Sequence, residues 1–178
     1  MRLLSRKPAE DEEARPEPEL VEAAPEPAAP QPGPEVLRDG PLLARWFIVY
    51  ELEKELKRAA RHERPLSVMV LVPTPTLGEA PSPESVLRAA HAAQSAARST
   101  DLIGWLPGNG ILVVMPETDK DGAAAAVNRW RDAMYTSTMR LGAVRWRVAT
   151  SVNAWEYQTA AALLDDVLAR LEPAEKAA

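Results

Sequence analysis

Residues 101–115 read DLIGWLPGNGILVVM, in which two short apolar runs flank the turn-forming sequence Pro107-Gly108-Asn109-Gly110. An Asn-Gly pair tolerates the positive φ angles that tight hairpin turns require. The stretch therefore predicts a β-hairpin with one strand over residues 101–106 and the other over residues 111–115.

Helical and extended patterns alternate on the N-terminal side of this hairpin. Apolar residues at spacings of three and four, with charges between them, indicate an amphipathic helix that follows Pro41 and ends near His62. The run LSVMVLV at 66–72 is apolar throughout, which is typical of an interior strand covered on both faces, and Pro73 and Pro75 are expected to end it. After a loop, Ser82-Pro83-Glu84 begins an alanine-rich helix that runs to about Ser99.

The C-terminal side continues the alternation. The sequence predicts a helix over about 120–138, a strand over 144–154 and a last helix over 157–171. The first of these helices is expected to place one set of residues on its apolar side: Ala124, Val127, Trp130, Ala133 and Met134. The order helix, strand, helix, hairpin, helix, strand, helix predicts an α+β fold with one mixed sheet flanked by helices.

The first 40 residues differ in composition from the rest of the chain. From Lys7 to about Asp39 the sequence is almost entirely Pro, Glu and Ala, without a periodic apolar pattern. Such a segment cannot bury enough surface to offset its ordering entropy. We expect residues 1–40 to form a disordered acidic tail, which serves either as a tether or as a solvated segment without a specific role. Residues 41–172 then form the domain and residues 173–178 a short C-terminal tail.

Charge and cysteine content exclude several classes of function. The first 40 residues hold ten acidic and five basic side chains, so they account for the whole net charge of −5. The remainder lacks the basic excess that binds phosphate backbones, and nucleic acid is not an expected partner. There is no cysteine to form a disulfide or bind a metal, and His62 and His91 stand far apart without a ligand pattern. No apolar run approaches the roughly 20 residues that span a bilayer, so we expect a cytoplasmic protein.

Several stretches resemble the GGDEF family, the cyclases that join two GTP molecules into cyclic di-GMP. Residues 98–119, RSTDLIGWLPGNGILVVMPETD, are similar without a gap to the family pattern RxxDLxxRxGGDEFxxxLPxTD. Residues 55–67, ELKRAARHERPLS, resemble ExxRAxRxxxPLS at the end of the first family helix, and weaker similarities occur at 84–87 and 150–152. The resemblance covers about residues 42–155 and implies the palm-like fold of nucleotide cyclases, with a central, largely antiparallel mixed sheet flanked by helices.

The same alignment departs from the family at the positions that carry its chemistry. Phosphoryl transfer to a 3′-hydroxyl needs acidic groups that hold magnesium. The family places them at the end of its first central strand and in the hairpin signature, where this chain has Val72, Asn109 and Gly110. The guanine-reading segment is replaced by the proline-rich loop 74–83. We therefore expect no catalytic residue, metal site or cofactor, and a degenerate signature loop that consists of Pro107, Gly108, Asn109, Gly110 and Ile111.

Arg98 and Asp101 match the family's inhibitory RxxD motif. The resemblance implies that they bind cyclic di-GMP, because a guanidinium can donate to guanine O6 and N7 while a carboxylate accepts from the N1 and N2 hydrogens. A structural interpretation stays open. An arginine at a helix C-terminus interacts favourably with the helix dipole, and an aspartate that opens a strand is a common turn residue.

Two functions of different classes follow. The favoured one is a catalytically inactive GGDEF-like domain that regulates bacterial signalling and binds cyclic di-GMP through Arg98 and Asp101. The alternative is a module for protein interaction or dimerisation without a nucleotide ligand. An active cyclase would need carboxylates that the alignment does not supply.

Overall fold

The structure, a computed structural model, describes residues 38–75, 80–138 and 144–171. The chain divides into two compact units, Met1–Gln31 and Pro32–Ala178, and every described residue belongs to the second. The predictions for residues 1–37 and 173–178 lie outside the described residues. The sheet begins at Arg38, inside the segment assigned to the tail from composition.

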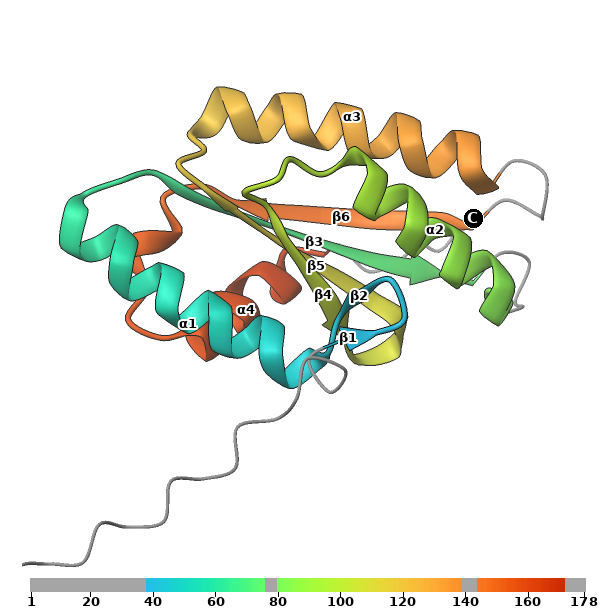
Figure 1. Cartoon of the computed structure of the whole chain (residues 1–178), viewed down its shortest axis with the longest axis horizontal. Helices are drawn as coiled ribbons and strands as arrows, with labels where there is room; N and C mark the ends of the chain where they lie inside the picture. The colour runs from blue at the N-terminus through green and yellow to red at the C-terminus, as the bar shows by residue number, and fades with distance from the viewer. Residues whose placement is uncertain (1–37, 76–79, 139–143, 172–178) are drawn as a thin grey trace, which may run out of the picture. The chain divides into compact units, whose positions relative to one another are not determined.

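A six-stranded mixed sheet forms the centre of the second unit, with α1 and α4 on one face and α2 and α3 on the other (Figure 1). The strand order is β1-β2-β4-β5-β3-β6, and every neighbouring pair is antiparallel except β2 with β4. This confirms the predicted fold class. The strands are β1 (Arg38–Asp39), β2 (Leu42–Leu43), β3 (Leu66–Thr74), β4 (Leu102–Leu106), β5 (Gly110–Pro116) and β6 (Arg145–Ser151). The helices are α1 (Arg45–His62), α2 (Pro83–Ala96), α3 (Lys120–Thr138) and α4 (Ala160–Ala169), with 3-10 turns η2 (Pro107–Asn109) and η3 (Ala154–Glu156).

Strand β3 shows why the sheet is covered on both faces. Its side chains alternate between two hydrophobic clusters, so that Val68 and Val70 pack on the side of α1 and α4 while Met69 and Leu71 pack on the side of α2 and α3. The prediction of an interior strand from the continuous apolar run is confirmed.

The predicted end of this strand is wrong, because β3 continues through Pro73 to Thr74 and pairs there with β6. The carbonyl of Leu71 points to β5, since it lies 3.5 Å from the position of a Cβ on Gly110. Backbone groups two residues apart in a strand face the same side, so the nitrogen of Pro73, which carries no hydrogen, also faces the β5 side. The pairing with β5 has already ended at Leu71, so no ladder hydrogen bond is lost.

The first predicted helix begins too early. Leu42 lies in β2 and belongs to the cluster under α2 and α3, whereas α1 buries Ile48, Leu52 and Leu56 in the cluster on the opposite face. A residue that packs on the far side of the sheet cannot continue the apolar stripe of α1. The helix therefore begins at Arg45.

Three other boundaries also differ from the prediction. Helix α2 ends at Ala96, three residues before the expected end. Strand β6 stops at Ser151, because Asn153 adopts a φ of 56° and starts the turn η3. Helix α4 begins only at Ala160, where the hydroxyl of Thr159 accepts a hydrogen bond from the N–H of Ala162 at 3.2 Å.

Helix α3 has the predicted bounds but a shifted apolar face. Ala123 and Ala126 are buried together with Trp130 and Met134, whereas Ala124 is exposed. The four consecutive alanines include no polar residue that would mark the exposed side of the helix. The sequence alone therefore does not determine which alanines face the sheet.

None of the helices within the described ranges is long and apolar enough to span a membrane.

Candidate functional site

The hairpin turn forms as predicted, with a small difference in its backbone. Positive φ angles occur at Gly108 (67°) and Asn109 (60°), whereas Gly110 is extended with a φ of −68°. Pro107, Gly108 and Asn109 are exposed, and Gly110 and Ile111 are buried. The signature loop thus presents three residues to solvent and anchors its last two in the sheet.

Gly110 has little room for a side chain. A Cβ at this position would lie 3.2 Å from the Cβ of Leu106 and 3.3 Å from the carbonyl oxygen of Pro107. Both contacts are tighter than ordinary van der Waals distances, so the turn would have to shift to accept a larger residue.

Val72, the other position at which the alignment lacks an acid, lies on β3 opposite Arg147. Its half-buried side chain packs against the core cluster of α1 and α4. Over residues 38–75, 80–138 and 144–171, no three His, Cys, Asp or Glu side chains come together in a way that could hold a metal ion.

Asp101 holds the turn between α2 and β4 in place. Its Oδ2 accepts a hydrogen bond from the backbone N–H of Arg98 at 2.8 Å and lies 3.9 Å from the guanidinium of Arg129 on α3. The Asp101 side chain is only 1% exposed. The backbone N–H of Asp101 donates in turn to the carbonyl of Arg98 at 3.1 Å. These contacts agree with the interpretation of Asp101 as a turn residue at the start of a strand.

Arg129 is a residue that sequence reasoning missed. Its Nε donates to the carbonyl oxygen of Ala96 at 2.7 Å, at the last turn of α2, and its other end approaches Asp101. It therefore ties the C-terminus of α2 to α3. No local spacing could have identified it, because it stands 28 positions after Asp101 in another helix.

Arg98 lies differently from Asp101. Its exposed side chain lines an open groove of about 460 Å³ between α1 and the start of β4, together with Arg58, Thr100, Leu102, Pro116 and the carboxylates of Glu51, Glu55 and Glu117. Asp101 is not among the lining residues. Asp101 thus contacts Arg98 through the backbone N–H of Arg98, and the Arg98 side chain lies in the groove.

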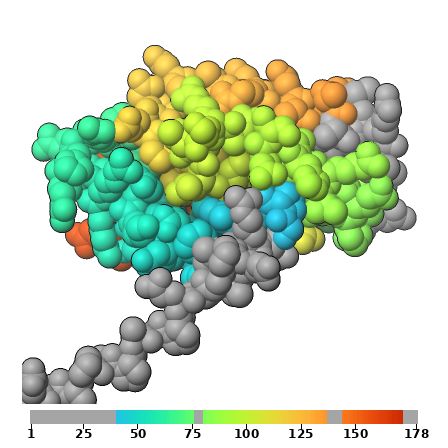
Figure 2. Space-filling model, in the orientation of Figure 1, coloured from blue at the N-terminus to red at the C-terminus, as the bar shows by residue number. Residues whose placement is uncertain are grey.

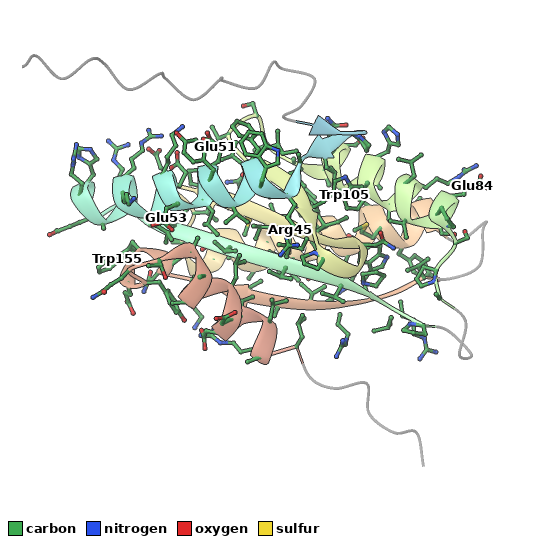
Figure 3. The ribbon with its side chains drawn as sticks, turned by 90° about the horizontal axis from the view of Figure 1, so that it is seen from below. Arg45, Glu51, Glu53, Glu84, Trp105 and Trp155 are labelled. Carbon is green, nitrogen blue, oxygen red and sulfur yellow. The ribbon has the colours of Figure 1, made fainter. Side chains whose placement is uncertain are left out.

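A second groove, of about 580 Å³, opens beside the hairpin turn. It is lined by Gly108 and Asn109 of the turn, by residues at the start of α2, by Trp105 and Leu106 of β4 and by Gly40 and Arg45 near the start of α1. Figure 3 labels Arg45 and Trp105, two of the residues that line this groove. Arg45 is the only charged residue among the described lining residues of this groove.

Comparisons with known proteins bear on the fold. No family profile and no curated protein sequence matches the chain. Several solved structures are similar to it. A DGC protein from Thermotoga maritima is 12% identical with a TM-score of 0.61, and the alignment covers 77% of this chain and 98% of that one.

Two further structures carry ligands or partners. The GGDEF domain of DgcB from Caulobacter crescentus, in complex with cyclic di-GMP, is 15% identical with a TM-score of 0.65, over 76% of this chain and 87% of that one. The diguanylate cyclase SiaD from Pseudomonas aeruginosa, in complex with its activator SiaC, is 24% identical with a TM-score of 0.59, over 75% of this chain and 59% of that one. The second unit of this chain therefore has the fold of GGDEF domains.

Proposed function

We propose that this chain is a cytoplasmic GGDEF-like signalling domain without diguanylate cyclase activity and with a regulatory role. The observation that carries the proposal is the hairpin turn, which presents Asn109 and Gly110 at the positions of the family's acidic pair. Magnesium needs oxygen ligands, preferably carboxylates, to sit between a triphosphate and the attacking hydroxyl. Val72 supports the same conclusion, because its half-buried side chain packs into the core and offers no oxygen.

A cyclase assay tests this proposal. The purified chain is incubated with GTP and either magnesium or manganese, and cyclic di-GMP is measured by chromatography beside an active cyclase and a no-enzyme control. We expect no product above the no-enzyme control. Product formation by the wild-type chain would contradict the proposal.

Restored acids provide a stricter form of the same test. The triple variant Val72→Asp, Asn109→Asp, Gly110→Glu should also be inactive, because the proline-rich loop 74–83 replaces the family's guanine-reading segment. Because a side chain at position 110 would meet close contacts, the triple variant can lose stability. The single substitution Asn109→Asp leaves Gly110 unchanged and serves as a control that keeps the fold.

A second candidate function is a receptor for cyclic di-GMP, and it rests on the exposed guanidinium of Arg98 in the 460 Å³ groove. A GGDEF domain of similar fold has been solved with this ligand. In a calorimetric titration, Arg98→Ala should weaken binding by about one to two orders of magnitude, because a charged hydrogen-bonding partner contributes roughly 1.5 to 3 kcal/mol.

Arg88→Ala is the matched control, since Arg88 is an exposed arginine on α2 that pairs with Glu84 and does not line this groove. Binding that survives Arg98→Ala unchanged would place the ligand elsewhere. If the titration releases or absorbs no heat at high micromolar cyclic di-GMP, the receptor function is rejected and the function as a protein-interaction module is favoured.

A further inference from the structure

The outward side of α1 carries a continuous row of exposed side chains. We call it the outer stripe and define it as Trp46, Tyr50, Lys54, Lys57 and Arg61. Spacings of three and four place these residues on one helix face, opposite the buried Ile48, Leu52 and Leu56. Figure 2 shows the side chains of α1 at the surface of the molecule. Trp46 and Tyr50 are 46% and 55% exposed, so two adjacent large aromatic residues face solvent.

The aromatic half of this stripe is held in a fixed arrangement. The rings of Trp46 and Phe47 lie 5.4 Å apart, and those of Phe47 and Tyr50 stack at 6.3 Å. Lys54 Nζ lies 5.4 Å from the centre of the Tyr50 ring and 2.8 Å from Glu51 Oε1. A surface whose rings are already ordered loses little side-chain entropy when it binds.

The two halves of the stripe are complementary to each other. The first half is aromatic, and the second half carries the cations Lys57 and Arg61. Cations bind favourably to the faces of tryptophan and tyrosine rings. Two copies of α1 that meet antiparallel about the midpoint between Glu53 and Lys54 place Trp46 opposite Arg61 and Tyr50 opposite Lys57. A parallel arrangement would instead bring the cations of one copy against those of the other.

We propose that the outer stripe of α1 is a self-association surface and that its occupant is a second copy of this chain in a two-fold antiparallel arrangement. Such an interface is isologous, since each copy contributes the same patch. A single pair of 18-residue helices, each about 27 Å long, falls in the small class of interfaces, so the dimer is weak and depends on concentration. The proposal goes beyond the loss of catalysis and is independent of it.

Cysteine cross-linking tests the arrangement directly, because the chain has no cysteine of its own. With a short bismaleimide, Lys54→Cys should cross-link with itself, since position 54 lies beside the two-fold axis. Trp46→Cys alone should not, because the two copies of position 46 stand about 22 Å apart along the helix axis. A mixture of Trp46→Cys and Arg61→Cys should give the mixed dimer.

The control is Tyr135→Cys, which is on α3, across the sheet from α1, where Tyr135 is 65% exposed. It should give no dimer. Self-cross-linking of Trp46→Cys, or no cross-link of Lys54→Cys at high protein concentration, would overturn the antiparallel pairing.

Sedimentation velocity over a concentration series provides the second measurement. Trp46→Ser should weaken the dimer by about tenfold or more, because each copy loses its contact between the Trp46 ring and the Arg61 cation of the other copy, whereas Tyr135→Ser should leave it unchanged. Circular dichroism confirms that each variant is folded. A wild-type chain that stays monomeric at the highest concentration, or a dimer that Trp46→Ser does not weaken, would reject a second copy as the occupant.

Discussion

At the scale of single residues, one glycine determines how closely α1 approaches the sheet. Gly104 on β4 has no side chain, and a Cβ built there would lie 2.4 Å from the Cβ of Ile48. Ile48 is fully buried in the core cluster of α1 and α4. The bare backbone at this position is therefore a packing requirement, because atoms in a protein core cannot come that close.

Gly104→Ala should destabilise the domain by about 1 to 3 kcal/mol, because α1 would have to move away from β4. Urea denaturation of the wild-type chain and the variant measures the difference. The double variant Gly104→Ala, Ile48→Gly should lose less stability than the sum of the two single variants, since removing the Cβ of Ile48, the nearest atom at 2.4 Å, creates room for the methyl group. An unchanged unfolding midpoint in Gly104→Ala would show that α1 can shift without cost.

The residues of the RxxD motif should respond differently to mutation. Asp101→Ala removes a buried charged acceptor of the Arg98 N–H and leaves Arg129 without its carboxylate, so we expect a loss of about 1 to 3 kcal/mol. Arg98→Ala removes an exposed side chain and should change stability by less than about 0.5 kcal/mol. Urea denaturation at neutral pH compares the two. Equal losses would mean that the Arg98 side chain also supports the turn.

The sequence predicts local residue roles better than distant ones. Ser82 was expected to begin a helix, and its hydroxyl accepts a hydrogen bond from the Ser85 N–H at 3.2 Å, three residues away. The burial of Asp101 was not predictable, because it depends on Arg129 in another helix.

At the scale of elements, α4 depends on contacts from both of its ends. The carboxylate of Glu53 on α1 accepts a hydrogen bond from the N–H of Ala160 at 2.7 Å, at the first turn of α4 (Figure 3). Near the C-terminal end, the carboxylate of Asp166 accepts hydrogen bonds from the hydroxyl of Tyr157 and from Arg170. The predicted start at Tyr157 was three residues early. The backbone of Tyr157 is extended, and its side chain reaches α4 through the hydrogen bond to Asp166.

Asp166 gives the domain a pH dependence with a defined sign. The hydrogen bond from Tyr157, followed by the charge of Arg170, holds the pKa of Asp166 below its usual value of 3.8. A carboxyl whose pKa is lower in the folded state stabilises the fold above its unfolded pKa, and this contribution disappears as the pH falls through the folded pKa. The melting temperature of Asp166→Asn should therefore lie below that of the wild-type chain at pH 7. The difference should shrink below about pH 4, the usual range of the carboxyl.

Differential scanning fluorimetry across this pH range checks the prediction. Asp165→Asn is the control, because it removes the same carboxylate charge from the neighbouring, exposed aspartate. A difference between Asp166→Asn and the wild-type chain that stays constant down to pH 3 would show that the effect is not electrostatic.

At the scale of the molecule, the described part of the chain is one sheet with a separate hydrophobic core on each face. The mixed sheet and the helices that flank it were predictable, because the alternation of helical and extended patterns is strong. The strands β1 and β2 were not predictable. Each has two residues, too few to show any period, and they form only by pairing, β1 with β2 and β2 with β4.

Two truncations separate the contributions of these N-terminal residues. Removal of residues 1–31, whose composition offers no core-forming pattern, should change the melting temperature by less than about 2 °C. Removal of residues 1–41 also deletes β1 and leaves β2 at the terminus, so the melting temperature should fall by several degrees. Both chains are compared with the full chain by differential scanning fluorimetry. A large decrease for the shorter truncation would contradict the composition argument.

The proline in β3 limits how far the β4–β5 hairpin can be extended. A hairpin that gained residues at its tip would need β3 to supply the next backbone donor beyond Leu71, and Pro73 has none on that side. Extra residues inserted between Gly108 and Asn109 would therefore project from the sheet as a loop instead of adding to the ladder. This tip is a natural point at which to insert a peptide label, because the sheet stops there whatever the length of the insert.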